Sequence, residues 1–202
     1  SVKIAYDFFK GKATNMLLAG IAIFLAVIAI GRMINGTLGA FSPTGTLDFG
    51  AYWYHGHFLR FGSHWTYLAR DLAEFPNSPS GSLPAVITPP LMFVLSSFSY
   101  LPWPLAKIIW ITILVSLVLA IPLVLLHLLP AKISLINKIF IALSFYAFTG
   151  TSIAIRVGQP TILVLFLILM TLITLRGRGR VLPGIILGLA LSKFSLSLPL
   201  LL

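Results

Sequence analysis

Residues 15–34 read NMLLAGIAIFLAVIAIGRMI. Apart from Arg32 near its end, this stretch contains no charged side chain. A helix rises about 1.5 Å per residue, so a run of this length covers the roughly 30 Å of a bilayer's hydrocarbon core. The stretch therefore predicts a helix that crosses a membrane.

The composition of the whole chain agrees with this prediction. Of the 202 residues, 58% are hydrophobic and 9% are charged, whereas roughly a quarter of the residues in soluble domains are charged. The net charge of +10 indicates topology signals and contacts with anionic lipids, and no nucleic-acid partner is expected. The chain has no cysteine, which excludes disulfides and Cys-ligated metals. We expect an all-α polytopic membrane protein.

The other apolar runs predict about five spans in a single membrane domain covering residues 1–202. The predicted spans are residues 15–34, 105–129, 138–155, 161–175 and 181–202. Residues 35–87 form an outer loop. Residues 88–104 have an apolar core of about a dozen residues, which is short for crossing, and we expect an interfacial or re-entrant helix there.

The distribution of Lys and Arg supports this topology. Eight basic residues then face the cytoplasm together with the N-terminus, as the positive-inside rule requires. These are Lys3, Lys10, Lys12, Lys132, Lys138, Arg176, Arg178 and Arg180. Five remain outside: Arg32, Arg60, Arg70, Lys107 and Arg156. If residues 88–104 crossed the membrane instead, the numbers of Lys and Arg residues inside and outside would roughly invert.

One of the four acidic residues of the chain, Asp48, lies among aromatic residues in the stretch GTLDFGAYWYHG, residues 45–56. An acid just outside a span is commonly a helix cap or a solvated loop group. A carboxylate can also take a proton from an acceptor hydroxyl as a general base. Both interpretations of Asp48 stay open at this point.

Cations near the outer face form a second candidate group. Lys193 lies about twelve residues into the last predicted span, roughly 18 Å deep, where an unpaired cation costs about 3 kcal/mol. Arg156 lies beside Gly158 and Gln159 at the outer end of another span. These cations either reach the interface or hold a phosphate leaving group. Aromatic residues of the loop suit the interfacial belt or stacking on a sugar.

The order of the motifs along the chain resembles a known family. The motifs are Asp48-Phe49 with Tyr52 and Tyr54, the run Thr88-Pro89-Pro90-Leu91, the set Leu101, Pro102, Ala106 and Trp110, GQPTILVLFLIL from Gly158, and GIILGLALSKFSLSLPLLL from Gly184. This set is similar to the polyprenyl-phosphate-dependent membrane glycosyltransferases of the GT-C fold. In particular it resembles glycosyltransferase family 87, which includes phosphatidylinositol-mannoside mannosyltransferases.

The resemblance implies a GT-C-like helical bundle in a cell inner membrane. It also implies transfer of a hexose, with mannose favoured, from a polyprenyl-phosphate donor to a lipid or glycan acceptor on the outer face. The catalytic base would be Asp48, and the donor phosphate would lie near Lys193, Arg156 and Gln159. The residues expected to contact substrate are Tyr52, Tyr54, His55 and Arg60. Such a donor generally needs no metal, and we expect no cofactor.

The chain departs from the family in length, because members are considerably longer and have several more spans. It is therefore expected to be either part of a longer enzyme or a shortened relative, and whether it is an enzyme stays open. The alternative function is a catalytically inactive, structural GT-C-like subunit of a larger membrane complex, respiratory or photosynthetic. Its partners would then be membrane lipids and other membrane subunits.

Overall fold

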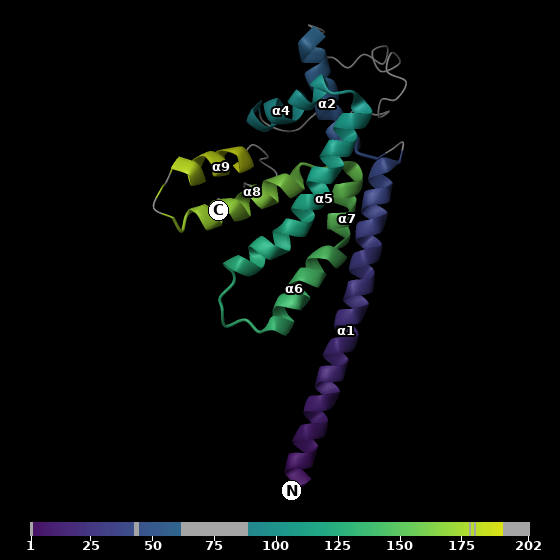
Figure 1. Cartoon of the computed structure of the whole chain (residues 1–202), viewed down its shortest axis with the longest axis vertical. Coiled ribbons are helices and arrows are strands. Elements are labelled where there is room, and N and C mark those ends of the chain that lie inside the picture. Colours follow the sequence, from purple (N-terminus) through teal and green to yellow (C-terminus); the bar gives the residue numbers. More distant parts are fainter. Residues whose placement is uncertain (1, 43–44, 62–88, 178, 180, 192–202) are drawn as a thin grey trace.

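The computed structural model describes residues 2–42, 45–61, 89–177, 179 and 181–191, and every regular element in them is helical (Figure 1). The elements are α1 (Val2–Phe41), α2 (Leu47–Phe61), α4 (Pro89–Ser96), the 3₁₀ helix η1 (Ser97–Tyr100), α5 (Trp103–Leu128), α6 (Leu135–Ala147), α7 (Thr149–Val157), α8 (Thr161–Thr174) and α9 (Val181–Leu191). The predicted all-α polytopic membrane class is confirmed.

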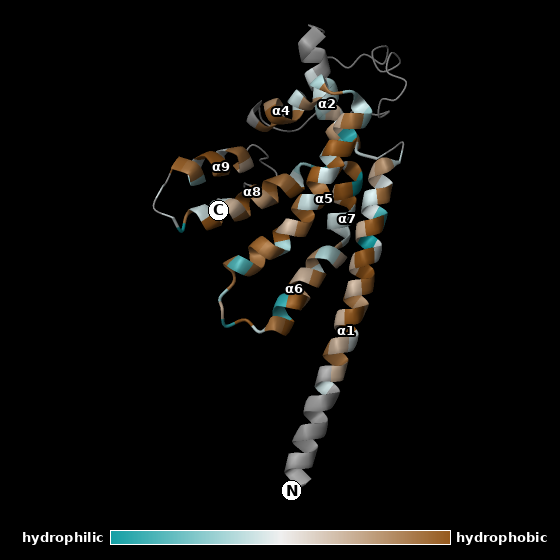
Figure 2. Cartoon of the chain, viewed as in Figure 1, coloured by the Kyte–Doolittle hydropathy of each residue, from teal (hydrophilic) through white to brown (hydrophobic). Residues whose placement is uncertain are grey.

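Two helices of the described residues are long and apolar enough to cross a membrane, α5 and the segment Met16–Phe41 of α1. Helices α6 and α7 meet this criterion together, as one span bent by 45°. Helices α8 and α9 are apolar but have only 14 and 11 residues. Figure 2 shows that hydrophobic residues predominate along both. Their crossing of the membrane stays a prediction.

Helix α1 continues to Phe41, past the predicted end of the first span at residue 34. The predicted outer loop therefore begins as helix and also contains α2. Arg32, which we expected outside, lies within the candidate span Met16–Phe41. Helix α4 has eight residues, about 12 Å, which is too short to cross a hydrocarbon core.

Small residues let α1 and α7 approach closely. A Cβ added to Gly36 would lie 2.8 Å from the carbonyl oxygen of Ser152, and one added to Gly39 would lie 3.0 Å from Cγ of Arg156. Such contacts are characteristic of helix pairs in membranes, where close backbone approach replaces the hydrophobic effect as the source of association. Residue 36 pairs with 152 and residue 39 with 156, so the two helices run in the same direction.

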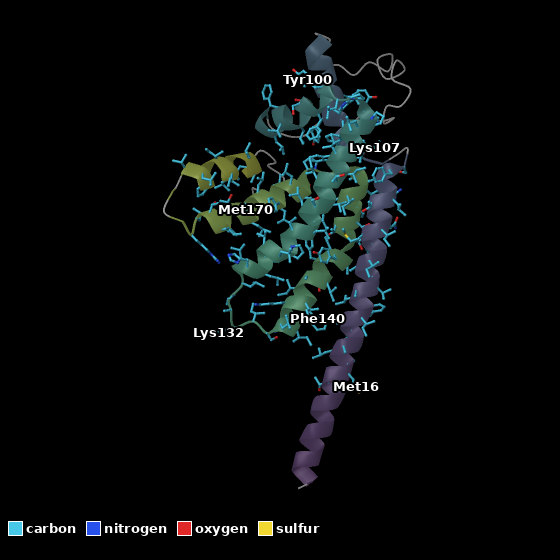
Figure 3. All side chains as sticks on the ribbon, in the orientation of Figure 1. Met16, Tyr100, Lys107, Lys132, Phe140 and Met170 are labelled. Carbon is cyan, nitrogen blue, oxygen red and sulfur yellow. The ribbon has the colours of Figure 1, made fainter. Side chains whose placement is uncertain are left out.

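The bundle therefore has two distinct ends. At one, which we call the junction end, α1 finishes, α5 begins and α7 finishes (Figure 1). At the opposite end, Nη2 of Arg176 donates a 3.1 Å hydrogen bond to the carbonyl of Leu128, the last residue of α5. Lys132 lies just beyond, and Figure 3 shows it far from Lys107 of the junction end. Lys132 and Arg176 thus lie at one end of the bundle and Lys107 at the other, and the side of the membrane that each end faces stays a prediction.

Candidate functional site

The site is built around the connection between α1 and α2, which we call the junction, residues 39–42 and 45–47. Helix α1 is closed by Ser42, whose hydroxyl and amide both donate to the carbonyl of Gly39, at 2.6 and 3.2 Å. The amide of Gly45 then donates to the carbonyl of Ser42 at 3.0 Å. These bonds turn the chain back tightly before α2 starts at Leu47.

Thr46 joins the junction to α7. Its amide donates a 2.8 Å hydrogen bond to the backbone carbonyl of Arg156, and its side chain is completely buried. Its φ of 61° is left-handed, a conformation that β-branched residues adopt at a cost of about 1–3 kcal/mol. Such strain persists only where surrounding contacts hold it, and the bond to Arg156 is one of them.

Asp48 follows two residues later, in the first turn of α2 and half-buried. The unpaired amides of a helix N-terminus carry partial positive charge, which stabilises a carboxylate at this position. A general base must be ionised before it accepts a proton, so this position suits the role expected of Asp48. The structure thus places Asp48 beside the segment that carries Arg156.

The turn between α7 and α8 is the other wall of the site. Gly158 has a left-handed φ of 72° and ends α7, and the amide of Gln159 donates back to the carbonyl of Ala154 at 2.8 Å. Trp110 of α5 fixes this turn, because its Nε1 donates to the carbonyl of Gly158 at 3.0 Å. The ring of Trp110 stacks in turn on Phe49 of α2, with centroids 4.9 Å apart.

The Arg156 side chain is exposed, while its aliphatic stem lies on Gly39 of α1. A guanidinium held in this way is available to a phosphate. Of the predicted site residues, Arg156 and Gln159 therefore lie at the junction end, and Asp48 follows Thr46, which bonds to the Arg156 backbone, by two residues. Lys193 lies outside the described residues.

The predicted substrate-contacting residues all lie on α2. Tyr52 and Tyr54 are buried, 5% and 1% exposed, which favours a supporting role in the core over direct contact with a substrate. Burial raises the pKa of Tyr54 to about 12. His55 and Arg60 lie further along α2, and their side chains are outside the described part of the structure.

Lys107 is a residue of this site that the sequence did not single out. Its Nζ donates to the carbonyl of Ser42 at 2.9 Å, which places a second cation at the junction. A lysine in the first turns of a span ordinarily indicates an interfacial anchor, so no sequence signal distinguished it. Among the described residues, no group of three or more His, Asp or Glu side chains could hold a metal ion.

The comparisons with known proteins identify the family of the chain. No curated protein and no solved structure shows a significant match to the chain. The family model for glycosyltransferase family 87 matches residues 85–201, more than half of the 202 residues. The matched region contains α4 to α9, and hence the Arg156–Gln159 turn and Lys107. The chain belongs to glycosyltransferase family 87, a family of membrane glycosyltransferases.

Proposed function

We propose that this protein transfers a hexose, with mannose favoured, from a polyprenyl-phosphate donor to a hydroxyl of a lipid or glycan acceptor at the outer face of an inner membrane. The observation that carries the proposal is the Thr46–Arg156 hydrogen bond. It brings a carboxylate and a guanidinium to one end of the bundle, and the reaction needs both a base and a cation.

In the proposed reaction the acceptor oxygen attacks the anomeric carbon and the bond from that carbon to the phosphate oxygen breaks. Asp48 takes the proton of the acceptor hydroxyl. The polyprenyl phosphate leaves with the electron pair, and Arg156 neutralises the charge that develops on it. Gln159 and Lys193 complete the phosphate site. Direct displacement inverts the configuration at the anomeric carbon.

The direct test is transfer of labelled mannose from a polyprenyl-phosphate donor by the purified protein in lipid vesicles that contain acceptor lipids. Replacement Asp48→Asn keeps the size of the side chain and removes the base, so kcat should fall by about 10²–10⁴-fold. Asp71→Asn, in the same predicted loop, is the matched control and should leave kcat unchanged. Undiminished transfer by Asp48→Asn would remove Asp48 as the base.

Arg156 is tested separately, through donor binding. Replacement Arg156→Gln should raise KM for the donor and lower kcat, because a cation is lost from the phosphate site. Arg156→Lys keeps the charge but loses the planar fork of donors, and it should recover part of the activity. Equal activity of the wild type, Arg156→Gln and Arg156→Lys would mean that Arg156 is only an ordinary residue of the membrane interface. A wild-type protein that transfers no sugar would favour the structural-subunit alternative.

A further inference from the structure

Lys107 connects the beginning of α5 to the end of α1. Its side chain is half-buried, and its Nζ lies 2.9 Å from the carbonyl oxygen of Ser42. The last carbonyls of a helix have no partner within the helix and carry partial negative charge. An ammonium group is therefore well suited to this position, and a bond of this kind is stronger than one between neutral groups.

The same carbonyl organises the junction. It also accepts the amide of Gly45, at 3.0 Å, so Lys107 binds the atom around which the chain turns from α1 towards α2. Four residues beyond Ser42, Thr46 is held from the other side by the carbonyl of Arg156. The junction is thus fixed at two points, one on α5 and one on α7.

Asp48 follows the second of these points by two residues. Because Thr46 adopts a left-handed conformation that costs energy, the junction will relax if one of its fixed points is lost. Relaxation would move the start of α2, and with it Asp48, relative to Arg156. A displacement of about 1 Å at a reacting group can reduce a rate by about a hundredfold.

We propose that Lys107 is a positioning residue, which holds the Ser42 carbonyl and thereby keeps Asp48 at its place beside the α7–α8 turn. The effect of Lys107 on catalysis rests on the proposed function. The effect of Lys107 on the structure of the junction is independent of that function and can be measured without any substrate.

The chain contains no cysteine, so the alkylation rate of a single introduced cysteine measures the accessibility of that position alone. Thr46→Cys places the reporter at a completely buried position in the junction, where alkylation by N-ethylmaleimide should be slow. Ser152→Cys is the matched reporter, because Ser152 is also buried but lies where α7 packs on Gly36. Each reporter cysteine is made in three backgrounds: the wild-type Lys107, Lys107→Met and Lys107→Arg.

Lys107→Met keeps a long side chain but removes the donor. We expect it to accelerate alkylation of the thiol at position 46 by about tenfold or more, because a charge-assisted hydrogen bond is lost. The thiol at position 152 should stay protected. Lys107→Arg should restore slow alkylation at position 46, because a guanidinium can also donate to the Ser42 carbonyl.

Two results would overturn the proposal. One is a thiol at position 46 that stays protected in Lys107→Met. The other is equal loss of protection at both positions, which would make Lys107 a support of the whole fold. In the transfer assay, Lys107→Met should lower kcat by about a hundredfold with KM for the donor nearly unchanged. If the wild-type protein transfers no sugar, the proposed function fails while the alkylation result still decides the role of Lys107 at the junction.

Discussion

The amide of Thr46 donates a 2.8 Å hydrogen bond to the carbonyl of Arg156, across 110 positions of sequence. Thr46 immediately precedes α2, and Arg156 is in the last turn of α7. Because of this bond, α2, the short helix that carries Asp48, starts beside Arg156, the candidate phosphate-binding residue. The relation follows from the packing of α1 on α7, and the predictions below test that packing and its consequences.

Gly39→Cys combined with Arg156→Cys should form a disulfide on mild oxidation. A Cβ at position 39 would lie 3.0 Å from Cγ of Arg156, and Cγ marks where the sulfur of a cysteine at 156 would be. The bond lengths and angles of a disulfide place each Cβ about 3 Å from the opposite sulfur. Cross-linking is read as a shift in mobility that a reductant reverses.

Gly20→Cys combined with Arg156→Cys is the control for this pair. Nothing lies within 4 Å of a Cβ added to Gly20, so no bond should form within a molecule. Cross-linking of both pairs at similar rates would contradict the close approach of α1 to α7 at position 39.

Gly158→Ala should destabilise the protein by about 1–3 kcal/mol. The φ of Gly158 is 72°, and an added Cβ would lie 3.1 Å from Cβ of Phe49 and 3.2 Å from Thr46. Both strain and crowding therefore act against the substitution. Thermal unfolding in detergent measures the effect, which should appear as a lower Tm.

The matched variant is Gly184→Ala, in α9. Nothing lies within 4 Å of its added Cβ, and alanine in a helix interior is more stable than glycine by about 0.5–1 kcal/mol. Its Tm should stay the same or rise. A similar fall in both variants would show that the Gly158 turn has no special requirement.

Tyr54 should remain neutral well above the usual range of tyrosine. Burial raises its pKa from 10.0 to about 12, so between these values the folded state keeps a proton that the unfolded chain loses. The contribution of Tyr54 to stability is therefore complete below pH 10 and is lost as the pH rises through 12. Tyrosinate absorbance during an alkaline titration measures this late ionisation.

Tyr54→Phe should diminish the late part of that titration, because it removes a tyrosine that is only 1% exposed. If all six tyrosines of the chain ionised together near pH 10 in the folded protein, the burial of Tyr54 would be wrong.

The two ends of the bundle should lie on opposite sides of the membrane. Single thiols from Ala131→Cys and Gly177→Cys, near the end of α5, should respond alike to a membrane-impermeant maleimide in sealed vesicles. A thiol from Tyr100→Cys, beside the beginning of α5, should show the opposite response. By the positive-inside rule, positions 131 and 177 should face the cytoplasm. Labelling of all three from one side would contradict the arrangement.

Parts of the fold could be predicted because their signals are local. The apolar runs at residues 15–34 and 105–129 contain enough hydrophobic residues to identify α1 and α5 directly. The end of α1 could not be predicted, because the stretch around Gly36 and Gly39 looks like a loop. Those glycines extend the helix by allowing contact with Ser152 and Arg156, a contribution that appears only when α7 is in place.

The bend between α6 and α7 is a second feature that we did not predict. The predicted span at residues 138–155 contains no proline, yet the helix breaks at Phe148, which is extended. The break is stabilised by Thr151, whose hydroxyl donates to the carbonyl of Phe145 at 2.9 Å. Threonines form such local bonds in many settings, so this one could not be singled out beforehand.

The sequence by itself determined that this is a helical membrane protein and that Asp48 and Arg156 are candidates for chemistry. Both inferences rest on local properties, namely the transfer of apolar side chains into lipid and the rarity of charge in such a chain. Only the tertiary structure decided that Thr46, two residues before Asp48, meets the backbone of Arg156, and that Lys107 binds the same junction. That outcome depends on hydrogen bonds to the backbone carbonyls of Arg156 and Ser42. Because every residue has a backbone carbonyl, the sequence does not mark these two. Only the packing of the helices selects which carbonyls accept the bonds.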